Sequence, residues 1–315
     1  MDGMTAQVTV FIPTLNGGSK LGEVLDAVLA QECDFEFDLL VFDSESTDEK
    51  THQALKDRNV EWRTIRRTEF NHGQTRNEAA QASSSEVMAF LSQDACPANR
   101  RWLAKLVDPI LRNNAVASYA AQQPTADCHP YQLLNLNKHM DEAEELELRQ
   151  PLTAAEFEAM EPQERVERIR FDNVSSAIRR TVLLELPFPV TDFGEDLEWS
   201  RNILLAGEST AFVKNAVVFH SHAVSKGEFF DRVMAVHKSL RELCDFVPID
   251  NRRLQLRRIL GTTLRFQQAC LATKTAGFAT RFLGFVMAPV FATMQMEAMY
   301  RGCHQAEYQA PETGA

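Results

Sequence analysis

The sequence predicts an α/β fold: a mostly parallel central sheet with helices on both faces, followed by a helical C-terminal extension. Strand-length apolar runs alternate with helix-length amphipathic runs over the first 113 residues, a pattern typical of parallel sheets. Polar side chains follow three of the apolar runs, at the edge where ligands of such sheets bind. From Phe229 to about Met299 the pattern is helical.

The first half supplies the parallel part of the predicted sheet. Its strands are expected at Val8–Ile12, Asp38–Phe42, Val60–Ile65 and Val87–Leu91. Its helices are expected at Lys20–Gln31, Thr47–Lys56, Gly73–Ser83 and Asn99–Arg112. In the first of these helices, apolar residues recur at helical spacing from Leu21 to Leu29.

The second half is less regular. Cys128–Ile169 reads as surface helices and a connection, and Phe171–Ile178 as an extended segment. The remaining elements before the extension are a helical turn at Thr181–Leu186, an amphipathic helix at Glu195–Leu205 and a strand at Thr210–Phe219. We expect two domains, residues 1–225 with the sheet and residues 226–315 with the helical extension.

Composition narrows the function classes. The 315 residues are 44% hydrophobic and 24% charged, as in ordinary soluble proteins, and the net charge is −11. No nucleic-acid partner is expected, because broad contacts with a phosphate backbone need an excess of Lys and Arg. The six cysteines form no CxxC pair, and the N-terminus has no basic region before its short apolar run, so a cytoplasmic location is predicted.

The apolar stretch Ala276–Met294 raises the question of a membrane. Arg281 and Pro289 interrupt it, whereas a spanning helix needs roughly 20 apolar residues. Four interpretations stay open: a packed helix pair, a homodimer contact, a peripheral contact with the inner membrane face and, least favoured, a true span.

Acidic groups end two runs that lie about a hundred residues apart in the chain. Leu91-Ser92-Gln93-Asp94 follows a buried strand, and Phe193-Gly194-Glu195-Asp196 opens a helix. Arg76 precedes them, and His220 and His222 follow them. Such a set can hold a divalent cation on a diphosphate while one carboxylate acts as a base, which is what sugar transfer from a nucleotide requires.

The sequence lacks the nucleotide-binding motifs of dinucleotide-binding proteins and of P-loop proteins. Asn16-Gly17-Gly18 after the first strand does not match GxGxxG, and no GxxxxGK[ST] loop occurs.

The motifs, taken in order, resemble the family 2 glycosyltransferases of the GT-A fold, which is Rossmann-like. The match begins with Val10–Asn16 and Val41–Asp48. Phe70–Asn77 and Leu91–Pro97 are similar to the bacterial rhamnosyltransferase branch, and Phe193–Asp196 and Val217–His222 complete the order. The resemblance covers roughly residues 7–225.

The resemblance implies roles for individual residues. Asp196 would be the general base, with Glu195 beside it, and Asp94, His220 and His222 would face a Mg²⁺ or Mn²⁺ ion. His72 and Trp199 would contact the donor sugar or the acceptor. The residues expected to bind the nucleotide are Pro13, Thr14, Asn16, Asp43, Ser44, Arg76, Ser92 and Gln93.

One position departs from the family pattern. Ser92 replaces the first aspartate of the DxD metal motif, which leaves Asp94 as the only carboxylate there. A serine can still hydrogen-bond a ribose, and magnesium sites often take most of their ligands from phosphates and water.

Structural explanations compete with several of these roles. Asp43 and the pair Glu195–Asp196 also suit helix N-termini, and Trp199 also suits a core position.

The resemblance implies an inverting glycosyltransferase. Its donor would be a nucleotide sugar, dTDP-L-rhamnose above all, and its acceptor a saccharide or a lipid-linked saccharide in surface polysaccharide synthesis. A non-catalytic nucleotide-sugar-binding scaffold or regulator of the same fold is the alternative. A sugar-nucleotide pyrophosphorylase is less consistent, because no Arg or Lys stands between Thr14 and Lys20.

Overall fold

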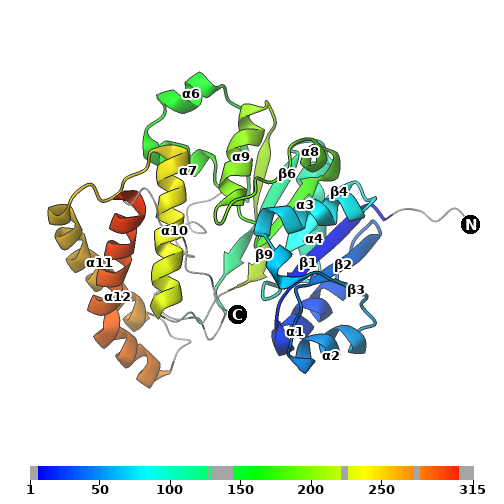
Figure 1. Ribbon diagram of the computed structural model, residues 1–315, viewed down its shortest axis with the longest axis horizontal. Helices are drawn as coiled ribbons and strands as arrows, with labels where there is room; N and C mark the ends of the chain where they lie inside the picture. Colours follow the sequence, from blue (N-terminus) through cyan, green and yellow to red (C-terminus); the bar gives the residue numbers. More distant parts are fainter. Residues whose placement is uncertain (1–5, 126–127, 129–144, 221–225, 273–276, 305–315) are drawn as a thin grey trace, which may run out of the picture. The chain divides into compact units, whose positions relative to one another are not determined.

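The computed structural model describes residues 6–125, 128, 145–220, 226–272 and 277–304. These residues form two compact units (Figure 1). Unit 1 comprises the described residues up to Gln123, together with 145–157 and Ile169–His220; unit 2 contains Glu158–Arg168 and the described residues from 226 onward. The expected boundary near residue 225 stays a prediction, but helix α7 (Pro162–Arg168) groups with the C-terminal helices rather than with the sheet.

Among the described residues of unit 1, nine strands form one mixed sheet in the order β3-β2-β1-β4-β8-β6-β9-β5, with β7 paired to β9. The strands are β1 (Val8–Thr14), β2 (Phe37–Asp43), β3 (Trp62–Thr64), β4 (Val87–Leu91), β5 (Cys96–Pro97), β6 (Ala117–Gln123), β7 (Leu146–Arg149), β8 (Ser175–Arg179) and β9 (Thr210–Phe219). The four strands β3, β2, β1 and β4 are parallel, as predicted. β8 runs antiparallel to both β4 and β6, and β6 is parallel to β9.

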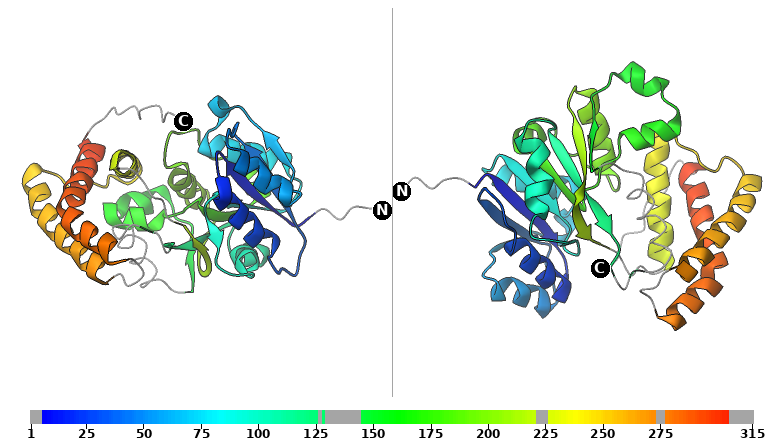
Figure 2. Two further views of the ribbon diagram at one scale, coloured as in Figure 1. Left: turned by 90° about the horizontal axis from the view of Figure 1, so that it is seen from below. Right: turned by 180° about the vertical axis from the view of Figure 1, so that it is seen from behind.

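Helices cover both faces of this sheet (Figure 2). The helices of unit 1 are α1 (Gly18–Leu29), α2 (Glu49–Asp57), α3 (His72–Ala82), α4 (Trp102–Leu111), α6 (Ala154–Ala159), which begins in this unit, α8 (Arg180–Glu185) and α9 (Glu195–Leu205); a 3₁₀ turn spans Arg67–Glu69. The apolar residues of α1, α2 and α4 share a core with Val8, Val10 and Ile12 of β1. Because side chains alternate along a strand, Phe11 faces the other side.

The second face carries an aromatic layer. Phe11 contacts Phe42 and Phe90 edge to face, and Phe90 contacts Phe188, which in turn contacts Trp199 of α9. Burial on both faces explains why β4 is a continuous apolar run and β1 a mostly apolar one, rather than alternating strands.

Unit 2 is helical. It contains α7 (Pro162–Arg168), α10 (Lys226–Cys244), α11 (Arg252–Ala272) and α12 (Phe278–His304). α11 and α12 pack on each other through Phe266, Cys270, Ala288 and Ala292. The C-terminal half of α12 packs on α10, where a Cβ on Gly302 would stand 2.4 Å from the carbonyl oxygen of Met234.

Candidate active site

Asp94 and His220 lie side by side although 126 positions separate them in the chain. Asp94 follows β4, and the short strand β5 after it pairs antiparallel with the end of β9, so that Cys96 stands opposite Phe219. This ladder brings Asp94 Oδ1 to 3.5 Å from His220 Nε2. His220 is buried, and Asp94 remains partly exposed. The two predicted metal ligands therefore meet at the carboxyl edge of the sheet.

Gln122 and Asp172 fix the orientation of the His220 ring. The amide nitrogen of Gln122 donates to Asp172 Oδ2, and its amide oxygen lies 2.8 Å from His220 Nδ1. Because that oxygen can only accept, Nδ1 carries the proton, and in the neutral ring the lone pair of Nε2 faces Asp94. A metal-binding histidine is typically held in this way by a hydrogen bond from its other nitrogen.

The donor set suits a divalent cation only in part. One carboxylate oxygen and one imidazole nitrogen are ligands that Mn²⁺ accepts. No group of three or more His, Cys, Asp or Glu side chains is arranged for a metal ion in the described part of the chain. His222, the third predicted ligand, lies outside the described residues. The remaining ligands would then have to come from phosphate oxygens and water.

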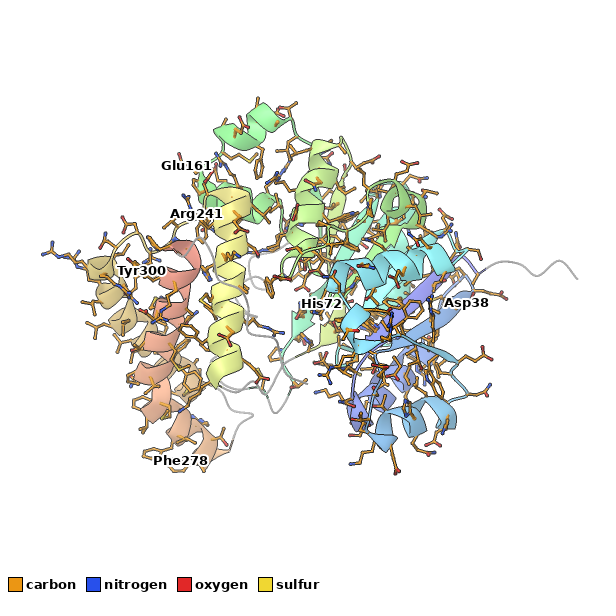
Figure 3. The ribbon with its side chains drawn as sticks, in the orientation of Figure 1. Asp38, His72, Glu161, Arg241, Phe278 and Tyr300 are labelled. Atoms are coloured by element: carbon orange, nitrogen blue, oxygen red, sulfur yellow. The ribbon has the colours of Figure 1, made fainter. Side chains whose placement is uncertain are left out.

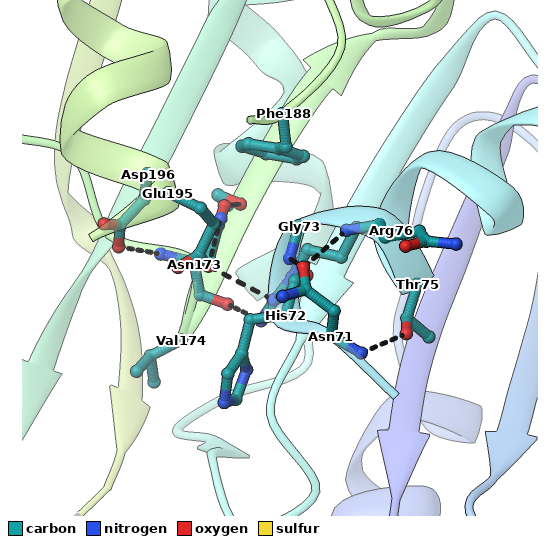
Figure 4. A network of polar contacts seen from close by, with 12 residues as sticks. Asn71, His72, Gly73, Thr75, Arg76, Asn173, Val174, Phe188, Glu195 and Asp196 are labelled. Atoms are coloured by element: carbon teal, nitrogen blue, oxygen red, sulfur yellow. Dashed lines mark hydrogen bonds and ion pairs between the residues drawn. The ribbon is translucent and has the colours of Figure 1, made fainter. Parts of the chain in front are cut away.

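Asp196 joins the same network from α9. Its Oδ2 accepts a hydrogen bond from the backbone N–H of Asn173 at 3.3 Å (Figure 4). Its Oδ1 accepts from the N–H of Leu197 at 2.8 Å. Burial, followed by the nearby carboxylates of Glu195 and Asp172, raises the pKa of Asp196 to about 8. A carboxyl group in that range can exchange a proton near neutral pH.

Glu195 has a different environment from its neighbour. It is 7% exposed, and its Oε1 lies 3.4 Å from Arg76 Nη1 and 3.2 Å from Asn173 Nδ2. Arg76 is 4% exposed and also donates to the carbonyl oxygens of His72 and Asn173 (Figure 4). These contacts hold α3, α9 and the approach to β8 together. The expected contact of Arg76 with a nucleotide stays a prediction, and the observed contacts are structural.

Asp94 and Asp196 are thus linked by a chain of contacts. It runs from Asp94 through His220 and Gln122 to Asp172, and the next residue, Asn173, binds Asp196. Burial raises the pKa of Asp172, which accepts a hydrogen bond from the N–H of Val174. The two acidic runs seen in the sequence are therefore connected by one network of contacts, and their convergence on a single site stays a prediction.

The loops after β1, β2 and β4 form a second hydrogen-bonded group. Gln93 Oε1 accepts from Thr14 Oγ1 at 2.7 Å and from Leu15 N at 3.0 Å, while Asn16 Oδ1 accepts from the backbone of Thr47 at 2.8 Å. Asn16 adopts a left-handed conformation with φ 49°. A Cβ at Gly17 would stand 2.8 Å from Gln93 Oε1 and 2.9 Å from Leu21 Cβ, so a larger residue there would force these side chains to shift. Gln93 and Asn16 therefore shape the loops, whatever else they bind.

The remaining predicted nucleotide contacts also lie at this edge. Asp43 is buried, accepts from the N–H of Ser46 and lies 3.2 Å from His52 Nε2. The hydroxyl of Ser44 is buried without a hydrogen-bond partner among the described residues. Pro13 and Ser92 are partly exposed at the ends of β1 and β4. The structure gathers these positions at one edge of the sheet, and their contact with a nucleotide stays a prediction.

Trp199 corrects one expectation. It is 1% exposed, its Nε1 donates to the carbonyl oxygen of Leu186, and its ring packs on Phe171 and Phe188. The prediction that Trp199 contacts the donor sugar or the acceptor is wrong, because its position in α9 places it in the core. His72 is exposed at the start of α3, beside the ring of Phe70 (Figure 3), so its contact with donor or acceptor stays a prediction.

Sequence reasoning missed Gln122, Asp172, Asn173 and His52. Asp172 and Asn173 precede β8, and because β8 is antiparallel its beginning lies at the edge where β4 ends. The available signal was the polar pair Asp172–Asn173 at the start of the predicted extended segment Phe171–Ile178.

The mixed α/β sheet with helices on both faces fits the GT-A fold of glycosyltransferases, and comparisons with known proteins agree. The model of "Glycosyl transferase family 2" matches residues 9–167. The O-antigen chain rhamnosyltransferase RfbN of Salmonella typhimurium is 32% identical over 233 residues, covering 72% of this chain and 70% of its own. WbaN of Salmonella anatum, also an O-antigen chain rhamnosyltransferase, is 27% identical over 227 residues, covering 71% and 69%.

Solved structures support the fold. The mannosyltransferase PcManGT of Pyrobaculum calidifontis, in complex with GDP-Man and Mn²⁺, has a TM-score of 0.58 at 18% identity, covering 97% of this chain and 89% of its own. Glucosyl-3-phosphoglycerate synthase of Mycobacterium tuberculosis, in complex with Mn²⁺, UDP and glucosyl-3-phosphoglycerate, has a TM-score of 0.51 at 16% identity, covering 78% and 82%. The chain belongs to glycosyl transferase family 2. Within that family it is a rhamnosyltransferase-like glycosyltransferase, which confirms the resemblance read from its motifs.

Proposed function

We propose that this protein transfers L-rhamnose from dTDP-L-rhamnose to a saccharide or lipid-linked saccharide in the synthesis of a surface polysaccharide such as O-antigen. The single observation that carries the chemistry is the contact chain from Asp94 to Asp196 at one edge of the sheet. The two rhamnosyltransferase relatives support the sugar, and we place the reaction in the cytoplasm, at the inner face of the membrane.

Asp196 acts as the base in this proposal. One of its carboxylate oxygens takes the proton of the acceptor hydroxyl while the acceptor oxygen bonds to the anomeric carbon. The bond from that carbon to the diphosphate oxygen breaks, and dTDP leaves with the electron pair. Attack opposite the leaving group inverts the anomeric centre. The raised pKa makes the Asp196 carboxylate a stronger proton acceptor than an ordinary aspartate.

Asp94 and His220 would hold a divalent cation for the diphosphate end of the donor. The two solved relatives with Mn²⁺ support this choice. When bound, the cation neutralises charge on the leaving diphosphate. Gln122 and Asp172 keep the lone pair of His220 Nε2 directed toward Asp94, and Arg76 and Asn173 hold Glu195, so that α9 presents Asp196 at a fixed position.

The test is transfer to a saccharide acceptor with a panel of nucleotide sugars and Mn²⁺. The proposal expects dTDP-L-rhamnose to be the preferred donor, Asp196→Asn to abolish transfer while donor binding persists, and the product to have the inverted configuration. Retention of configuration, or full activity in Asp196→Asn, would contradict it. Binding of the donor without transfer or hydrolysis by the wild-type protein would instead favour a non-catalytic scaffold.

A further inference from the structure

Unit 2 exposes an apolar stripe on two neighbouring helices. On α11, Leu256, Leu260 and Leu264 are 67%, 70% and 60% exposed and recur every four residues, so they lie on one side of the helix. Leu271 at the end of α11 and Phe278 and Phe282 at the start of α12 continue the exposed apolar surface; Phe278 is 83% exposed and lies at the end of the helix pair (Figure 3). These six residues are called the apolar stripe below. Such a patch marks an interaction surface.

The charge around the stripe is opposite to that of the rest of the chain. Residues 251–296 contain seven basic residues and no Asp or Glu, in a protein whose net charge is −11. Arg253, Arg257 and Arg258 are exposed on α11 and form no ion pair with any described residue. Apolar side chains beside unpaired arginines on a helix are typical of contact with an anionic membrane surface.

The packing of α12 argues against a membrane span. Of the described helices only α12 has the length and composition to cross a membrane. Its C-terminal half, however, is packed on α10 at Gly302, and Glu297 binds Arg252 and Gln255 of α11. A helix fixed in this way along its second half leaves too short an apolar stretch for a span of roughly 20 residues.

We propose that the apolar stripe and the arginines of α11 dock this protein on the surface of an anionic phospholipid bilayer without crossing it. The leucines and phenylalanines enter the boundary between headgroups and acyl chains, and the arginines bind the lipid phosphates. The proposal is independent of the chemistry above, because vesicle binding is measured without donor or acceptor.

Flotation of the full chain with vesicles tests it. Phosphatidylcholine vesicles in which phosphatidylglycerol replaces part of the lipid should carry the protein, and added salt should weaken the binding. Leu260→Glu with Leu264→Glu should lower the partition coefficient on these vesicles about tenfold or more. Arg253→Gln with Arg257→Gln should lower it about tenfold on anionic vesicles and leave weak binding to pure phosphatidylcholine unchanged.

Matched controls lie on unit 1. Leu29→Glu and Arg112→Gln alter exposed side chains of the same types and should bind vesicles like the wild type. All variants change exposed positions, so their melting temperatures should agree with that of the wild type. Failure of the wild type to float, or equal flotation of the stripe and control variants, would overturn the proposal. So would a wild-type dimer in sedimentation that Leu260→Glu with Leu264→Glu dissociates without any effect on flotation, since the stripe would then join two copies of the chain.

Discussion

Two adjacent carboxyl groups at the start of α9 have different surroundings. Glu195 is enclosed by Arg76 and Asn173, whereas Asp196 accepts only backbone N–H groups in the described contacts and lies near other carboxylates. The dipole at a helix N-terminus alone would stabilise the two carboxylates to a similar extent. Their contacts with α3 and with Asn173 therefore separate a positioning residue from the residue we expect to act as base.

The raised pKa of Asp196 predicts opposite effects on activity and on stability. Activity of the wild type should rise as pH increases toward about 8, since the base must be ionised. A folded-state pKa above the unfolded value of 3.8 means that the carboxyl group stabilises the fold fully only below that value, and that stability is lost as pH rises toward about 8. Asp196→Asn removes this ionisation, so its melting temperature should exceed that of the wild type by an amount that grows between these pH values.

Melting curves over a pH series check the stability half of this prediction, and initial rates check the activity half. Asp192→Asn, at an exposed aspartate in the loop before α9, is the control and should track the wild type. A constant difference in melting temperature between Asp196→Asn and the wild type at all pH values would count against the raised pKa.

Gln122 gives a second prediction at the scale of single residues. Gln122→Met keeps the side-chain volume but removes both hydrogen bonds, so that His220 loses the partner that fixes its proton on Nδ1. The affinity for Mn²⁺ should fall about 10- to 100-fold, as is typical when the partner of a metal-binding histidine is removed. Electron paramagnetic resonance titration of Mn²⁺ with dTDP present measures this directly. Gln123→Met alters the exposed neighbouring side chain and should leave the affinity for Mn²⁺ unchanged. Equal affinities of the two variants would show that Gln122 has no role in Mn²⁺ binding.

At the scale of elements, helix α3 positions the segment that leads into α9. Asn77 donates to the carbonyl oxygen of Phe188 and accepts from its N–H, while Asn71 caps α3 and donates to the carbonyl oxygen of Thr191. Gly73 allows the close approach, because a Cβ there would stand 2.5 Å from the carbonyl oxygen of Pro189. The Asn71–Asn77 segment therefore helps to position Asp196, whether or not it also contacts a ligand.

Gly73→Ala tests this role of α3. The added methyl group meets backbone rather than a flexible side chain, so it should lower the free energy of unfolding by about 1–3 kcal/mol and displace the loop before α9. Gly261→Ala is the matched control: that glycine is in α11 with nothing within 4 Å of a new Cβ, and the change should stabilise the protein by about 0.5–1 kcal/mol. Denaturant unfolding of both variants provides the comparison. If Gly73→Ala left the free energy of unfolding unchanged, the backbone at Pro189 would be able to move away from the added methyl group at little cost.

At the scale of the whole molecule, the sequence pattern predicted the strongly apolar elements well. β4, α9 and β9 have the predicted bounds, and the parallel half of the sheet is as expected. β6 was missed because Ala117–Gln123 is rich in alanine and glutamine and lacks the β-branched residues that mark a strand. β7 and β5 are too short for any periodicity to register.

Candidate site residues could likewise be predicted only where the element that carries them was predicted. Asp94, His220 and Asp196 follow or begin elements that were predicted, so they could be found from motif order. Gln122 lies on the missed strand β6, and Asp172 and Asn173 lie before a strand whose antiparallel direction no local pattern encodes. Trp199 was misassigned because a helical position beside the site and a core position have the same sequence spacing.

Ligand binding provides a prediction for the whole fold of unit 1. Since the donor binds only the folded state, dTDP-L-rhamnose at a hundred times its dissociation constant should add about 2.7 kcal/mol to the free energy of unfolding, or about 5–10 °C in melting temperature for a domain of this size. Mn²⁺ should increase the shift, and Asp94→Asn should abolish that increase while retaining the part due to the nucleoside, because Asp94 lies beside His220, whereas Asn16 is hydrogen-bonded to the backbone of Thr47. Thermal-shift titrations with dTDP-L-rhamnose, UDP-glucose and GDP-mannose, each with and without Mn²⁺, separate these contributions. A larger shift in melting temperature with GDP-mannose than with dTDP-L-rhamnose would refute the thymidine donor. A wild-type shift that is the same with and without Mn²⁺ would refute the role of Asp94 and His220 as metal ligands.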